Sequence, residues 1–157
     1  MKAVNPEKLR QSYAKGRRYF PSINLEKANL TAFDLQQAEL TRSNLAEACL
    51  RKACLVRAYL TRTDLSAADL SGADLSQANL VGARLQQANC AGADLSEAIL
   101  VEADLTLADL CGANLQGANL FRTKLKGATY DDRTQFDADF NPAKARMTKV
   151  ALEAQLG

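Results

Sequence analysis

The chain has 157 residues, with 20 Lys and Arg against 18 Asp and Glu, so its net charge is only +2. It contains no histidine, which excludes imidazole metal ligands, histidine general bases and Ser-His-Asp triads. No apolar run approaches the roughly 20 residues of a membrane-spanning helix, and the first residues lack the apolar stretch of a signal peptide. Only 6% of the residues are aromatic and none is Trp, so we expect a core of small and branched aliphatic side chains.

The first residues predict a short helix. Asn5 suits an N-cap and Pro6 suits the first helical turn, where its missing N–H is not needed. Leu9 and Tyr13 lie four residues apart, so their side chains share one helix face. We therefore expect a helix over about residues 6–15 whose apolar face covers the end of the fold that follows.

A five-residue repeat occupies residues 23–130. Taking every fifth position from residue 25 gives 22 residues, of which 20 are Leu and the exceptions are Cys90 and Tyr130. The position two residues before is Ala in 17 of the 22 cases, and the position directly before is Asn or Asp in 14. The repeating unit is therefore Ala, then Asn or Asp, then Leu, followed by two variable residues.

A spacing of five fits neither a straight helix nor a straight strand. On an α-helix, five residues advance about 500°, so successive leucines would spread around the axis. On a flat strand, side chains alternate with a period of two, so successive leucines would alternate between core and water. The pattern works when the chain bends once per unit, because the bend keeps Ala and Leu inside and winds the chain into a solenoid.

These units resemble the pentapeptide-repeat family, whose pattern is a small residue, Asn or Asp, Leu and two variable residues. The resemblance covers residues 23–130 without a gap and looks most like members common in cyanobacteria, most of which have no assigned activity. It implies an all-β solenoid, a right-handed quadrilateral β-helix with four units per coil, in which 22 units make about 5.5 coils.

The repeat ends in a register slip. The aromatic residue expected at position 135 appears instead as Phe136. Beyond it, four residues have the spacing of one helix face, which predicts a C-terminal helix over about residues 143–155. This helix either caps the last coil or, as in family members that dimerise end to end, mediates self-association. Its candidate association residues are Met147, Val150, Ala151 and Ala154.

We expect a single domain over residues 1–157, because no linker or low-complexity segment interrupts the chain. Its parts are an N-terminal helical cap at 1–22, the β-helix at 23–130, and an exit segment with a helix at 131–157. A solenoid of this kind needs both ends covered, which is the role expected of the two flanking segments.

The residues with reactive side chains do not indicate a catalytic or metal site. Cys90 replaces a central Leu and is expected to be buried, whereas Cys49, Cys54 and Cys111 occupy outward positions. No C-x-x-C pair accompanies them, so zinc and a disulfide framework are not indicated, and free thiols fit a cytoplasmic location. Most Asp residues precede a Leu, where they are expected to bond the turn backbone. We predict a non-enzymatic protein without a cofactor.

One face of the predicted rod is more apolar than the others. With four units per coil, every fourth unit from Leu40 to Leu120 shares a face. An exposed apolar patch is typical of a recognition surface, although single exposed apolar residues are also normal. We predict a protein-interaction or scaffold module for an unknown protein partner, or a homodimer, with this face as a candidate site. Its residues are Tyr59, Val81, Ile99, Val101 and Phe121.

The charge distribution supplies an alternative. Residues 63–120 contain eight acidic residues and one basic residue, a net charge of −7, while the flanking segments are basic. Some pentapeptide-repeat proteins resemble duplex DNA and bind DNA gyrase, so the resemblance implies a DNA mimic as the second hypothesis. No basic stripe with stacking aromatics is present, so nucleic-acid binding is not indicated. The acidic mid-rod residues are Asp64, Asp69, Asp74, Asp94, Asp104 and Asp109.

Overall fold

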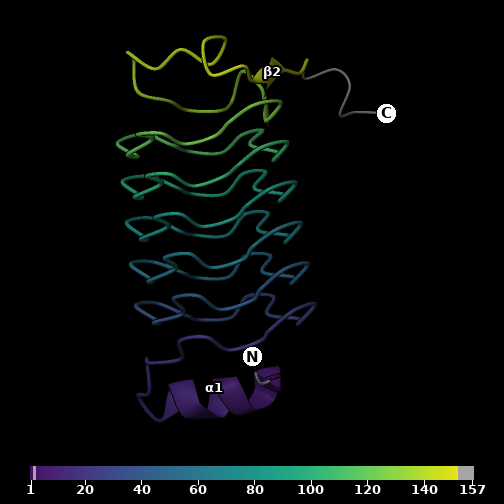
Figure 1. Ribbon diagram of the computed structural model, residues 1–157, viewed down its shortest axis with the longest axis vertical. Helices are drawn as coiled ribbons and strands as arrows, with labels where there is room; N and C mark the ends of the chain where they lie inside the picture. Colours follow the sequence, from purple (N-terminus) through teal and green to yellow (C-terminus); the bar gives the residue numbers. More distant parts are fainter. Residues whose placement is uncertain (2, 152–157) are drawn as a thin grey trace.

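The structure is a computed structural model that describes residue 1 and residues 3–151. The chain forms a rod of stacked coils, as Figure 1 shows. Helix α1 (Pro6–Ala14) lies across one end of the rod. At the other end, strand β1 (Thr129–Tyr130) pairs in parallel with strand β2 (Thr148–Lys149).

Most of the pairing between coils consists of single parallel bridges between residues 20 positions apart, such as Asn24 with Asn44 and Asn44 with Asp64. Because each unit has five residues, four units complete one coil. The units that share a position in successive coils form the four faces of the rod. We name these faces one, two, three and four by the central residues Leu65, Leu70, Leu75 and Leu80.

The interior of the rod is built from the Ala and Leu columns, as the repeat predicts. Leu65, Ala68 and Leu70 have no exposed surface, and the same holds for Cys90 in the Leu column. Each buried leucine stabilises the fold by about 1.5–3 kcal/mol before the loss of chain entropy is counted. The small Ala side chains beside the leucines allow the walls to approach closely.

Each unit ends in a β-turn that bends the chain. In one example, the N–H of Ala68 donates to the carbonyl of Leu65 at 3.1 Å, and the third turn residue, Ala67, has φ of 54°. Positive φ at the third residue is the mark of a type II turn. The Asp69 side chain accepts a hydrogen bond from the N–H of Ser71 at 3.1 Å, which ties the residue before Leu to the next turn.

Helix α1 confirms the prediction of an N-terminal helix. The Asn5 side chain accepts a hydrogen bond from the N–H of Glu7 at 2.8 Å, which caps the helix. Leu9 and Tyr13 are buried in the core, and the Tyr13 hydroxyl donates to the carbonyl of Gln36 at 2.6 Å. The helix therefore supplies both apolar cover and a polar contact to the first coil.

The β-helix begins one unit earlier than residue 23. Tyr19 pairs with Glu39 in the next coil, Ser22 has the positive φ of the repeated turn, and Phe20 occupies the Leu column with 6% of its surface exposed. Because the central residue of this unit is Phe and not Leu, the five-residue spacing of leucines does not reveal the unit. The segment assigned to the N-terminal cap thus contains both α1 and the first unit of the wall.

The predicted C-terminal helix over 143–155 is wrong for the described residues, which end at residue 151. Residues 142–146 form turns, and β2 follows at once. The N–H of Thr148 donates to Ala128 at 2.8 Å and that of Val150 to Tyr130 at 2.9 Å. These bonds use carbonyl groups at the edge of the last coil, which a helix leaves unpaired.

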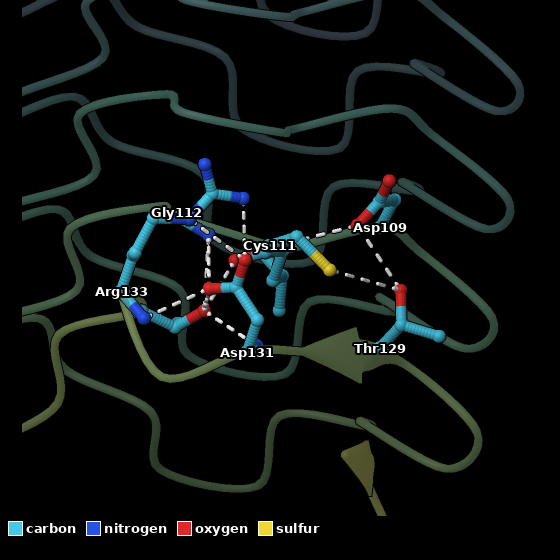
Figure 2. Close-up of polar contacts among 8 residues, drawn as sticks. Asp109, Cys111, Gly112, Thr129, Asp131 and Arg133 are labelled. Carbon is cyan, nitrogen blue, oxygen red and sulfur yellow. Dashed lines mark hydrogen bonds and ion pairs between the residues drawn. The ribbon is translucent and has the colours of Figure 1, made fainter. Parts of the chain in front are cut away.

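Asp131 closes the coil where the register slips, as Figure 2 shows. Gln135 pairs with Asn114, 21 positions away, so one extra residue enters this coil. In the regular coil below, the N–H of Gly92 donates to the carbonyl of Cys111 at 2.9 Å. At the slip, the N–H of Gly112 donates instead to the carboxylate of Asp131 at 3.0 Å and to the hydroxyl of Thr134 at 3.1 Å. Side chains therefore replace the missing backbone acceptor.

The Asp131 carboxylate is held in its charged form. Only 2% of the residue is exposed, and burial by itself would raise the pKa of its carboxyl group. Hydrogen bonds from the side chain and backbone of Arg133 and from the N–H of Gly112 outweigh burial and lower that pKa. The Arg133 Nε donates to the carboxylate at 2.9 Å. The exit segment therefore folds with the Asp131 carboxylate ionised.

Candidate interaction surface

The structure brings the five predicted face-four residues onto one outer wall. Parallel bridges join Tyr59 to Asn79 and Asn79 to Ile99, so these residues form one column. Val81, Val101 and Phe121 follow the central leucines of three successive coils and form a second column. Backbone hydrogen bonds place these coils in direct register. We call Tyr59, Val81, Ile99, Val101 and Phe121 the face-four row.

The side chains of the face-four row are partly or largely exposed to solvent. The exposed fraction is 61% for Phe121, 51% for Tyr59 and 39% for Ile99, and both valines are half-buried. The equivalent outward positions on face three hold polar residues such as Ser76 and Ser96. Face four therefore differs from its neighbour in chemistry although the backbone repeats.

A groove of about 650 Å³ continues face four toward the N-terminal end of the rod. Tyr19 lies in the same column as Tyr59 and has 66% of its surface exposed. Tyr19 was not predicted as a site residue because it precedes the first leucine unit, although it lies five residues before Asn24, in the register of the repeat. The groove is lined by Tyr19, Pro21, Ser22, Glu39, Thr41, Arg42, Thr61, Arg62 and Val81.

Arg42 and Arg62 stack on one rim of this groove in successive coils. The N–H of Arg42 donates to Thr61 at 3.0 Å and the N–H of Arg62 to Val81 at 2.9 Å, which fixes the two backbones side by side. Neither guanidinium forms an ion pair among the residues that the structure describes. Two adjacent cations without carboxylate partners favour an anionic group nearby.

The acidic mid-rod residues are distributed over three faces and do not form one stripe. Two lie on each of faces one, two and three, and each accepts a hydrogen bond from the backbone N–H two positions later. On face one, Arg84 lies 3.4 Å from Asp64 and Lys124 lies 3.4 Å from Asp104. These contacts assign a turn-stabilising role to the carboxylates and neutralise part of the negative charge.

Asp104 shows how the turn acts on such a carboxyl group. Burial raises its pKa, but hydrogen bonds from Thr106 and the charge of Lys124 outweigh burial, so the pKa lies below its usual range. A general acid at neutral pH needs the opposite shift. The arrangement therefore favours a permanently charged side chain in a structural role.

The cysteines divide into two pairs by burial. Cys90 is fully buried as predicted, and burial raises the pKa of its thiol to about 12. Cys111 is also buried, which corrects its expected outward position, and burial together with Asp109 raises its pKa to about 11. Cys49 and Cys54 are half-buried. The Cys111 thiol donates to the Thr129 hydroxyl of the next coil at 3.9 Å, and the neighbouring Gly112 is bonded to Asp131 (Figure 2).

The predicted C-terminal association residues do not share a helix face. Met147 is half-buried and packs against the rod's own core, and Val150 is half-buried and bonded through its N–H to Tyr130. Ala151 is exposed, and Ala154 lies outside the described residues. Self-association through a C-terminal helix therefore has no helical surface in the described part of the chain.

Two further features limit the chemistry of the surface. Across residue 1 and residues 3–151, no group of three or more cysteine or acidic side chains is arranged to hold a metal ion. In the same residues, no helix has the length and apolar character needed to cross a bilayer. What the surface offers is a rigid wall with one apolar face and a cationic rim.

A family model for pentapeptide repeats matches the chain in 8 copies, over residues 23–62, 58–89 and 88–127. The chain belongs to the pentapeptide-repeat family. Proteins of this family generally serve as structural or interaction modules. A search of curated proteins gives no match.

Solved pentapeptide-repeat structures resemble this one. A protein from Nostoc Pcc 7120 is 30% identical, with 94% of this chain and 97% of that one covered and a TM-score of 0.46. A protein from the cyanobacterium Cyanothece 51142 is 34% identical, with coverage of 83% and 99% and a TM-score of 0.44. A protein from the Arabidopsis thaliana thylakoid lumen is 26% identical, with coverage of 76% and 70% and a TM-score of 0.53. The shared fold is the pentapeptide-repeat β-helix.

Proposed function

We propose that this pentapeptide-repeat protein is a non-enzymatic interaction module that binds a protein partner along face four. The observation that carries the proposal is the face-four row, which places five apolar side chains in two adjacent columns on one wall of the rod, with Asn79 between Tyr59 and Ile99. The side chains of Tyr59 and Phe121 are more than half exposed, so water is in contact with large aromatic surfaces. Burying such surfaces is a main source of binding free energy in protein interfaces.

The groove beside the row indicates the chemistry of the partner. Its lining includes the cations of Arg42 and Arg62 and the apolar side chains of Pro21 and Val81. A segment with apolar side chains and an acidic residue matches this combination, because the apolar side chains fill the groove and the carboxylate pairs with the rim. Glu39 also lines the groove, and its carboxylate accepts a hydrogen bond from the N–H of Thr41 at 2.9 Å.

The test compares two double variants with the same number of added charges. V81E with V101E places carboxylates in the face-four row, and S76E with S96E places them at the equivalent positions of face three. Both variants are checked by circular dichroism and used, with the wild type, for affinity capture from the native cell. We expect the face-four variant to lose a partner that the face-three variant retains. An unchanged set of captured proteins contradicts the proposal.

The same two variants address self-association. Light scattering of the wild type measures its mass in solution, and a dimer through face four would dissociate in V81E with V101E but not in S76E with S96E. In that case the partner of face four is a second copy of the chain. A mass that does not differ among the three proteins leaves a different protein as the partner, and the capture experiment identifies it.

A DNA mimic that binds DNA gyrase is the alternative function, favoured by the net charge of −7 over residues 63–120. The charges lie on three faces, and the pairing of Asp64 with Arg84 and of Asp104 with Lys124 reduces their field. A supercoiling assay with purified gyrase tests this function. Inhibition or protection by micromolar protein supports the mimic, and unchanged supercoiling rejects it.

A further inference from the structure

The last coil leaves an open β edge on face four. In the coil below, the N–H of Leu100 donates to Asn119 at 2.9 Å and the N–H of Glu102 donates to Phe121 at 3.0 Å. One coil later, the equivalent N–H groups of Leu120 and Arg122 make no hydrogen bond within the described part of the chain. An unpaired strand edge of this kind is a template for another strand.

The chain's own exit segment passes this edge without pairing with it. Gln135 still pairs with Asn114 on face three, but the N–H of Phe140 then donates to Asp137 at 3.0 Å within a local turn. Pairing with the last coil resumes only where the N–H of Gly127 donates to Arg146 at 2.9 Å. The exit segment therefore covers faces three and one more completely than face four.

A groove with both apolar and acidic lining residues lies directly beside the open edge. Its volume is about 240 Å³. Ala118 and Leu120 are half-buried here, although their counterparts one coil below, Ala98 and Leu100, are fully buried. The missing coil thus leaves apolar side chains partly exposed as well as backbone groups unpaired. The groove is lined by Leu115, Ala118, Leu120, Asp137, Asp139 and Phe140.

We propose that an extended segment of a partner protein adds to this edge as one more parallel strand. The contacts of Asn119 in the coil below supply the pattern, because its N–H donates to Ala98 at 2.9 Å while its carbonyl accepts from Leu100. A partner residue in the equivalent place donates its N–H to the carbonyl of Ala118 and accepts from Leu120. Two residues later, a partner carbonyl accepts the N–H of Arg122.

The same geometry defines the side chains of the partner. The residue between the two pairing residues points inward, as the central leucines do, so an apolar side chain enters the groove. Asp137 and Asp139 line the groove, and the Asp137 carboxylate accepts the N–H of Gly117 at 2.8 Å. The nearby cation of Arg122 lies 3.3 Å from Glu102, which holds it toward the coil below. A basic residue two positions from the apolar one, outside the two pairing residues, therefore fits the two carboxylates.

This site lies at the end of the rod, and the inference does not depend on the proposed use of the face-four row. If V81E with V101E no longer binds the face-four partner, that result does not bear on the inference about the end of the rod. At the first coil, by contrast, the central residues Leu25, Leu30 and Leu35 are at most 1% exposed.

The probe is the peptide Lys-Thr-Leu-Thr-Lys, acetylated and amidated at its ends, titrated into the full isotope-labelled chain. We expect saturable shifts of the Leu120 and Arg122 amide resonances. L120A keeps the backbone N–H of residue 120 and L120P removes it. Both variants replace the leucine side chain with a smaller one. The peptide should bind L120P about tenfold more weakly than L120A, the change expected when one hydrogen bond is lost. Equal affinity for the two variants overturns the inference.

A second comparison remains informative if L120P does not fold. Methylation of the first Thr nitrogen of the probe removes its bond to Ala118 and should weaken binding to the wild type about tenfold. D139K should also weaken binding of this basic probe. Absence of saturable shifts at Leu120 and Arg122 contradicts the proposal. Protection of these two amides by dimerisation without peptide also contradicts it, because the occupant is then a second copy.

Discussion

Leu80 and Leu120 occupy the same column of face four, two coils apart, but their surroundings differ. Leu80 is fully buried and its N–H donates to Ile99 at 2.8 Å. Leu120 is half-buried and its N–H has no acceptor in the described residues. The backbone and the apolar side chains of a coil are therefore covered on both sides only where another coil follows it.

The outermost coils at the two ends of the rod are covered in different ways. At the N-terminal end, α1 places Leu9 and Tyr13 over the first coil. At the C-terminal end, the Asp131 carboxylate and β2 satisfy individual backbone groups but leave Leu120 partly exposed. A helix covers apolar surface well, whereas an irregular segment closes only the positions it reaches.

The largest expected effect comes from placing a charge in the shared column. L80D buries a carboxylate among aliphatic side chains without a partner, so we expect a loss of at least about 4 kcal/mol in the free energy of unfolding. L120D places the same group where water reaches it, so a loss of about 1–2 kcal/mol is expected. Urea unfolding followed by circular dichroism measures both. Equal losses would mean that the last coil is as closed as the middle of the rod.

Removing the Asp131 charge should weaken the C-terminal end selectively. D131N keeps an acceptor for Gly112 but loses the ion pair with Arg133, so we expect a loss of about 1–2 kcal/mol at pH 7. The folded pKa of Asp131 is lowered, so its stabilisation is complete above the unfolded value of about 3.9 and is lost as pH falls through the folded pKa. The difference between wild type and D131N should therefore shrink on acidification. A constant difference from pH 7 to pH 2 would exclude this role.

A substitution in a regular turn should affect the middle of the rod through the backbone alone. Ala67 is exposed and has φ of 54°, a conformation that costs non-glycine residues free energy. A67V adds a β-branched side chain there and should destabilise the protein by about 1–2 kcal/mol, whereas A67G should not. Thermal unfolding distinguishes them. The repeat turn is assigned incorrectly if A67V is the more stable of the two.

The smallest effect is a difference in thiol reactivity among the cysteines of the folded protein. Cys90 lies in the closed interior, and Cys111 precedes Gly112, whose N–H donates to Asp131. We expect iodoacetamide to modify Cys49 and Cys54 first in the folded protein, then Cys111, and Cys90 last, as measured by mass spectrometry over time. D131N should speed the modification of Cys111 but not that of Cys90. Modification of Cys90 before Cys111 would reverse the proposed order of local stability.

Much of the fold was predictable because the residue pattern that produces it is repeated in every five-residue unit. The five-residue spacing placed Ala68 and Leu70 inside, and the residue types before Leu indicated the bond from Asp69 to the next turn. The four-unit coil, which came from the family resemblance, then grouped Val81 with Val101 on one face. The use of that face by a partner remains a prediction.

The errors lie where a contact joins distant parts of the chain. The spacing of Met147 and Val150 suggested a helix, but the bond from Val150 to Tyr130 depends on an edge that exists only after the coil has formed. Burial of Cys111 was also not expected from its outward column, and the adjacent Gly112 is bonded to Asp131 where the register slips. The unit centred on Phe20 was not recognised for a different reason, since an aromatic residue fills the Leu column there.

Amide hydrogen exchange, resolved residue by residue on the wild-type protein, tests the contrast between closed and open coils most directly. The amides of Leu80 and Leu100 donate to the next coil, so they should exchange only through global or large-scale unfolding. The amides of Leu120 and Arg122 should exchange orders of magnitude faster in the same sample. Protection of Leu120 and Arg122 equal to that of Leu80 would contradict an open edge at the end of face four.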